Sequence, residues 1–177
     1  AGNDRFTLLS TATRTTTTVN GNAGGDTFLV QLGEPGSGPT LIHGNAGNDV
    51  VNVQAATGPL TVTGDAGDDT INLGSKSPQD QGNVRGLVSH LTLDGGAGYD
   101  TVNVDDTGTT TGNSGRLTAT MLTGLGLGSG VEYAALEELN LNLGPGDDTF
   151  TVDGSSAETL SRVRGNAGRD TFNGLNA

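Results

Sequence analysis

A six-residue motif recurs along the chain and constrains its fold more than any other feature. Five copies share Gly at positions one and four, Ala at three and Asp at six, and two partial copies keep the last Gly and the Asp. The motif aspartates are separated by 22, 23, 20, 31, 48 and 22 residues. The full copies are GNAGGD (21–26), GNAGND (44–49), GDAGDD (64–69), GGAGYD (95–100) and GNAGRD (165–170), and the partial ones are AGND (1–4) and LGPGDD (143–148).

Apolar residues stand at fixed distances from each motif aspartate. The residue two places after it is always bulky and apolar, and so is the residue four places after it, except for Gly174 in the last copy. Apolar residues also stand seven places before it, and the period of two on both sides predicts strands with one inward face. The positions two after the aspartate are Phe6, Phe28, Val51, Ile71, Val102, Phe150 and Phe172.

A strand, a GxAGxD turn, a second strand and a variable connection in about 20–23 residues make one coil of a solenoid. The sequence therefore predicts an all-β, parallel β-solenoid of the β-roll or β-helix kind, formed as one domain over 1–177. One edge would carry the GxAGxD turns and the other the variable loops. Only 3% of the residues are aromatic, which suits a thin core that neighbouring coils bury together.

Two segments depart from the regular repeat. Residues 105–143 are predicted to form atypical coils with a degenerate turn at LGLGSG (125–130), because this stretch has glycines but no aspartate. The loop GSKSPQDQGNVRG (74–86) explains the 31-residue interval. We expect it to lie outside the stack, so that shortening it would leave the fold intact.

Composition excludes several functional classes. The net charge of −12 argues against nucleic acid and anionic membranes as partners. The chain has no cysteine, which excludes a disulfide framework, and no apolar run long enough to span a bilayer. No Ser-His-Asp or phosphate-loop arrangement is present, and the paired carboxylates 68–69 and 137–138 point to opposite strand faces, so the chain is not expected to be an enzyme.

The motif aspartates would stack into one column of seven if the turns stack. Two carboxylates about 4.8 Å apart repel each other by about 0.9 kcal/mol in water and by about 3.5 kcal/mol at an effective dielectric constant near 20. Glycines at positions one and four would supply positive φ and expose carbonyls, and oxygen-only ligands favour Ca²⁺. The candidate ligands are Asp4, Asp26, Asp49, Asp69, Asp100, Asp148 and Asp170. In the alternative interpretation, each aspartate only caps its own turn through backbone N–H groups.

The five full copies resemble the calcium-binding nonapeptide GGxGxDxUx of the RTX (hemolysin-type) family, although the second glycine is kept only at Gly96. The resemblance implies a right-handed parallel β-roll with Ca²⁺ between successive turns, held by the motif aspartate and by turn carbonyls. The carbonyls would come from the region of Gly21, Gly24, Gly44, Gly47, Gly64, Gly67, Gly95, Gly98, Gly165 and Gly168. Family repeats run in tandem with ions on both edges, whereas the coils here are longer.

The chain is thus similar to repeat regions of giant secreted bacterial proteins and adhesins. We expect a non-enzymatic, extracellular or cell-surface spacer or filament unit that is stiffened by calcium. Because the sequence starts inside a motif and shows no capping element, it is expected to be a segment of a longer array or to associate end to end.

Two other functions are left open by the sequence. The chain could be an accessory repeat domain of a secreted enzyme. It could also bind glycan or ice on a flat Thr/Asn face, which the residues one and three places after each motif aspartate would form. These pairs are Thr27/Leu29, Val50/Asn52, Thr70/Asn72, Thr101/Asn103, Thr149/Thr151 and Thr171/Asn173.

Overall fold

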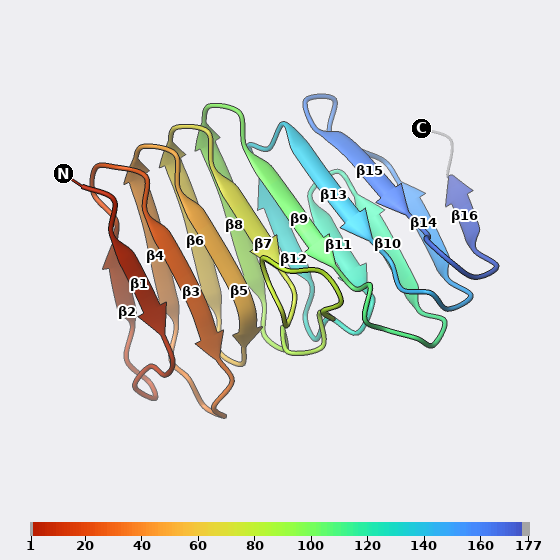
Figure 1. Ribbon diagram of the computed structural model, residues 1–177, viewed down its shortest axis with the longest axis horizontal. Helices are drawn as coiled ribbons and strands as arrows, with labels where there is room; N and C mark the ends of the chain where they lie inside the picture. The colour runs from red at the N-terminus through yellow and green to blue at the C-terminus, as the bar shows by residue number, and fades with distance from the viewer. Residues whose placement is uncertain (1, 175–177) are drawn as a thin grey trace.

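The computed structural model describes residues 2–174 and confirms an all-β fold of 16 strands in two mostly parallel sheets. The sheets lie face to face along the molecule, and the chain passes from one to the other at both edges (Figure 1). Sheet A has the order β1 (Arg5–Leu8), β3 (Thr27–Leu32), β5 (Val50–Ala56), β7 (Thr70–Leu73), β9 (Thr101–Asp105), β13 (Glu138–Asn142) and β15 (Leu160–Arg164).

Sheet B contains the other nine strands. Its order is β16 (Thr171–Gly174), β14 (Thr149–Asp153), β10 (Ser114–Thr118), β11 (Met121–Gly124), β12 (Val131–Ala134), β8 (Leu91–Ala97), β6 (Leu60–Ala66), β4 (Thr40–Ala46) and β2 (Thr17–Asn20). We call the edge where β2, β4, β6 and β8 turn into sheet A edge 1, and the opposite edge, where β3 and β5 lead back into sheet B, edge 2.

The core lies between the sheets and is built from ladders of the predicted inward residues. Phe28 and Phe150 are fully buried, and the Phe6 ring stacks on Phe28 with ring centroids 4.8 Å apart. Phe172 is 51% exposed because β16 is an edge strand that pairs only with β14. One complete ladder of partners runs through Leu8, Val30, Val53, Leu73, Val104, Leu141 and Val163.

The prediction of a single turn edge is correct only for the first half of the molecule. Strand β13, which precedes the 143–148 turn, pairs with β9 in sheet A, whereas the strands before the earlier turns belong to sheet B. The turns 143–148 and 165–170 therefore lie at edge 2, as Figure 1 shows. The motif has shifted by half a coil, and the seven aspartates do not form one column.

The segment 105–143 causes this shift, and it is not a pair of parallel coils with a degenerate turn. Strands β10, β11 and β12 form an antiparallel meander within sheet B. Its last strand, β12, pairs in parallel with β8, and the chain then crosses edge 1 into β13. Alternating apolar residues persist through the meander, so Leu117, Leu122 and Val131 are buried like those of the coils.

The loop 74–86 is part of the stack, which contradicts the expectation that it lies outside. Val84 and the adjoining Leu87 are fully buried, and Leu87 forms a parallel bridge with Ala56. The loop backbone is also bonded to the next layer, because Gly82 N–H donates to Asp105 Oδ2 at 2.6 Å. Shortening this loop would remove core side chains.

Candidate cation-binding turn edges

The motif aspartates of edge 1 form a ladder in which each carboxylate caps the turn of the preceding coil. This differs from the alternative interpretation of the sequence, in which each aspartate caps its own turn. The backbone N–H of one aspartate donates to Oδ1 of the next, and Glu137 ends the ladder. The bonds are Asp4 to Asp26 (2.6 Å), Asp26 to Asp49 (2.6 Å), Asp49 to Asp69 (2.7 Å), Asp69 to Asp100 (2.8 Å) and Asp100 to Glu137 Oε2 (2.7 Å).

The second carboxylate oxygen of the ladder aspartates is left without a partner. These Oδ2 atoms are buried and have no hydrogen bond within the described residues, although a buried ionised oxygen normally requires one. The residues themselves are at most 3% exposed. The five unpartnered atoms are the Oδ2 atoms of Asp26, Asp49, Asp69, Asp100 and Asp148.

At edge 1, a backbone carbonyl of the next coil lies close to each unpartnered oxygen. A Cβ added to Gly44 would stand 2.3 Å from Asp49 Oδ2 and 2.7 Å from the carbonyl oxygen of Gly64. The same arrangement recurs at Gly21 and Gly64. The first motif position must be glycine because there is no room for a side chain, which would displace the carboxylate. It does not have the positive φ that the sequence led us to expect.

Positive φ occurs at motif position four, as expected, and also at position two. Position two holds Asn22, Asn45 and Asp65 with φ of 75°, 74° and 72°. Asn and Asp are the non-glycine residues that tolerate this conformation best, which explains why they stand at position two. At position four, Gly47 has φ of 130°, and an added Cβ would lie 2.1 Å from the carbonyl oxygen of Gly24.

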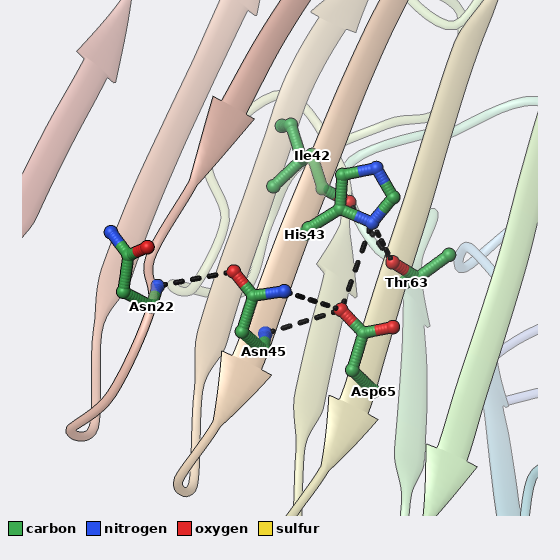
Figure 2. A network of polar contacts seen from close by, with 6 residues as sticks. All are labelled: Asn22, Ile42, His43, Asn45, Thr63 and Asp65. Atoms are coloured by element: carbon green, nitrogen blue, oxygen red, sulfur yellow. Dashed lines mark hydrogen bonds and ion pairs between the residues drawn. The ribbon is translucent and has the colours of Figure 1, made fainter.

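The position-two side chains form a second, outer ladder along edge 1 (Figure 2). Asn45 Oδ1 accepts the N–H of Asn22 at 3.2 Å, and Asp65 Oδ2 accepts both the N–H and the side-chain amide of Asn45 at 3.2 Å. His43 Nδ1 lies 2.7 Å from Thr63 Oγ1 and 3.7 Å from Asp65 Oδ2. These bonds hold successive turns in register.

Burial raises the pKa of four ladder carboxylates. The pKa of Asp69 rises to about 6, mainly because the carboxylate is buried; the N–H of Asp49 opposes the rise, and the charges of Asp100 and Asp49 add to it. Burial is also the largest cause of the raised pKa of Asp49, Asp100 and Asp148. At neutral pH the ionised carboxylates of the ladder therefore lower the stability of the fold.

Edge 2 carries a shorter version of the same ladder. Asp148 Oδ1 accepts the N–H of Asn113 at 2.7 Å, and the N–H of Asp148 donates to Asp170 Oδ1 at 3.0 Å. The structure therefore brings the predicted site residues together in two groups: Asp4, Asp26, Asp49, Asp69 and Asp100 at edge 1, and Asp148 and Asp170 at edge 2.

Sequence reasoning missed three acidic residues that belong to these edges. Glu137 completes the edge 1 ladder, and its offsets to Leu139 and Leu141 match those of the motif aspartates, so this signal was present in the sequence. Asp105 and Asp106 fasten the edge 2 loops: Asp106 Oδ1 accepts Thr109 Oγ1 at 2.7 Å, and burial raises the pKa of its carboxyl. No motif marks these two residues.

The flat Thr/Asn face is divided in the structure. The first four residue pairs lie side by side on sheet A, whereas Thr149/Thr151 and Thr171/Asn173 are on β14 and β16 of sheet B. On sheet A, Asn72 donates to Asn52, Asn103 to Asn72 and Asn140 to Asn103, at 2.9–3.0 Å. The face is thus a hydrogen-bonded ladder of amides rather than a free array.

Within residues 2–174, no group of three or more His, Cys, Asp or Glu side chains is placed to hold a metal ion. The same part of the chain contains no helix that could cross a membrane. Comparison with known proteins finds no relative, since no family model, curated protein or solved structure matches the chain.

Proposed function

We propose that the chain is a structural module, a β-solenoid spacer whose turn edges are stiffened by calcium. One observation carries this proposal: within residues 2–174, five buried carboxylate oxygens lack a partner, four at the same place in successive turns of edge 1 and the fifth, on Asp148, at edge 2. A carboxylate in such surroundings needs either a proton or a cation.

The residues fit a hard cation. Each unpartnered Oδ2 of edge 1 has a backbone carbonyl of the next coil beside it, contributed by Gly44, Gly64, Gly95 or Ala135. Carboxylate and carbonyl oxygens are the ligands that Ca²⁺ takes in flexible arrangements. At edge 2, Asp148 and Asp170 would serve in the same way. The bound ion would supply positive charge that offsets the repulsion between the stacked carboxylates.

The RTX resemblance of the turns supports the same proposal. Because the coils hold one another in register through the turns, cation binding would couple to folding. The module would act without catalysis in a secreted bacterial surface protein, an adhesin or a filament. Further repeats or another copy would continue the parallel stack at its outer strands.

A thermal melting experiment tests this proposal. We expect the melting temperature to rise between EDTA and millimolar Ca²⁺, in the affinity range of about 10⁻⁴–10⁻³ M that is typical of extracellular modules. Mg²⁺ at the same concentration should raise it much less, because Mg²⁺ demands a rigid octahedral site. Identical melting curves in EDTA and Ca²⁺ would refute the role of calcium.

A further inference from the structure

The structure contains a groove at edge 2 whose lining includes none of the aspartates proposed to hold calcium, although it borders the 143–148 and 165–170 turns. Two adjoining pockets of about 220 Å³ and 360 Å³ share Asp80 and Asn142 in their linings. The larger pocket falls within the range of small-molecule sites, and the smaller one extends it over sheet A. Loop residues 77–80 form one wall, and the turns around Pro145 and Asn166 form the other.

The groove is preformed because its wall is fastened to the layers beneath it. Gln54 Nε2 donates to the carbonyl of Ser77 at 2.7 Å, and the N–H of Gln81 donates to Thr107 Oγ1 at 2.8 Å. The N–H of Gly108 donates to the carbonyl of Gly82 at 2.7 Å. A ligand would therefore lose little affinity to ordering the loop.

The floor of the groove presents amide groups with unused hydrogen-bonding capacity. Asn72 and Asn103 lie in the amide ladder, which uses one N–H and one oxygen lone pair of each. Each amide has two N–H donors and two lone pairs. One donor and one acceptor thus remain on both, at neighbouring strands about 4.8 Å apart.

Asp80 adds one carboxylate to this lining. It is exposed, and its side chain has no ion pair within residues 2–174. Asp105 also lines the groove, but its oxygens are occupied by Gly82 and Thr107. Within residues 2–174 the lining of the two pockets contains no Lys or Arg, and Asp80 and Asp105 make it disfavour anionic ligands, although the Arg164 guanidinium donates to Asn142 Oδ1 at 3.3 Å.

We propose that this groove binds a neutral oligosaccharide. A hydroxyl group donates and accepts through the same atom, so neighbouring sugar hydroxyls can use the free donor and acceptor of each amide. The Asp80 carboxylate accepts from a further hydroxyl through a charge-assisted bond. Glycans that carry uronic or sialic acids are excluded by charge. This activity is separate from the proposed cation-dependent stiffening.

Binding is tested with the full chain in Ca²⁺ on an array of neutral and acidic oligosaccharides, followed by titration of the neutral hits. We expect dissociation constants near 1 mM, about −4 kcal/mol, because no aromatic side chain lines either pocket to stack on a sugar ring. Asp80→Asn and Asn142→Ala should each weaken binding at least tenfold. Glu34→Gln, which removes an exposed carboxylate from another edge 2 loop, should leave binding unchanged.

Three results would overturn this proposal. The first is no neutral glycan bound at about 10 mM. The second is equal loss of affinity in the Asp80 and Glu34 variants, and the third is preferential binding of the acidic glycans. All three variants should melt like the unmodified chain and keep its Ca²⁺ response, so failure here is distinguishable from failure of the calcium proposal.

Discussion

Asp69 Oδ1 accepts the backbone N–H of Asp49, one coil earlier, at 2.7 Å, while Oδ2 of the same carboxylate is buried with no partner among residues 2–174. One side chain therefore has two separable roles. Oδ1 accepts the N–H of the neighbouring turn. Oδ2 needs a proton or a cation to offset its buried charge.

Substitution of Asp69 separates these roles. In EDTA, Asp69→Asn should unfold at the same or a higher denaturant concentration than the unmodified chain, because it keeps the oxygen that accepts the Asp49 N–H and removes a buried charge. Asp69→Ala should cost about 1–3 kcal/mol, because it leaves that N–H unpaired. Both variants should respond less to Ca²⁺, whereas Asp80→Asn should respond fully. Equal stabilities of Asp69→Asn and Asp69→Ala in EDTA would contradict the capping role.

The raised pKa of Asp69 predicts a pH dependence of stability without metal. A folded-state pKa of about 6 lies above the usual value of 3.8, so the folded state holds the proton more tightly than the unfolded state. The free energy of unfolding should therefore rise on acidification from pH 7 to 5, by about 1 kcal/mol from Asp69 alone. The raised pKa of Asp49 and Asp100 adds in the same direction.

Urea unfolding in EDTA at several pH values measures this dependence. The gain at low pH should shrink in Asp69→Asn, because this variant has no proton to bind there. In Ca²⁺ the gain should also shrink, since protons compete with the ion for the carboxylates. Stability that falls steadily from pH 7 to 5 in EDTA would show that the ladder carboxylates are already satisfied.

The first glycine of the motif should not tolerate alanine. A Cβ at Gly44 would meet Asp49 Oδ2 at 2.3 Å and a backbone carbonyl at 2.7 Å. We expect Gly44→Ala to cost more than about 2 kcal/mol. Gly33→Ala is the control, since its nearest neighbour would be Ala55 Cβ at 3.8 Å, and it should change stability by less than about 0.5 kcal/mol. Chemical denaturation of both variants decides the point.

A pair of valines tests whether the 74–86 loop belongs to the core. Val84 is fully buried, whereas Val88, just beyond the loop, is 51% exposed. Val84→Ala should cost about 2 kcal/mol through lost burial and a residual cavity, while Val88→Ala should stay within about 0.5 kcal/mol. Equal small effects in urea unfolding would show that the loop can detach without loss of the solenoid.

The fold class could be predicted because its signals are local and repeated. Apolar residues two and four places after each aspartate, such as Val51 and Val53, predict strands with one inward face. The turn between the strands is marked by its own residues. The unpartnered oxygens were also foreseeable as stacked carboxylates, since the aspartate keeps one position in every turn.

The half-coil shift could not be predicted from these signals. A turn that ends in GxD has the same residues whether it leads from sheet B to sheet A or back, so nothing near Asp148 or Asp170 identifies its edge. The β10–β12 meander decides which edge the later turns occupy. Its antiparallel strands show the same alternation of apolar and polar residues as the parallel strands. Asp105 and Asp106 were missed because no motif marks them, and the backbone N–H groups of Gly82 and Val84 that they bind lie more than 20 residues earlier in the chain.

The most direct test of the calcium account is a crystal structure of the chain grown in millimolar CaCl₂, with an anomalous difference map. The account predicts peaks between successive turns at edge 1, within about 2.3–2.6 Å of Oδ2 of aspartates such as Asp49 and Asp69. A separate peak should lie beside Asp148 at edge 2. A well-resolved map with no peak at either edge, and with these oxygens still unpartnered, would contradict it.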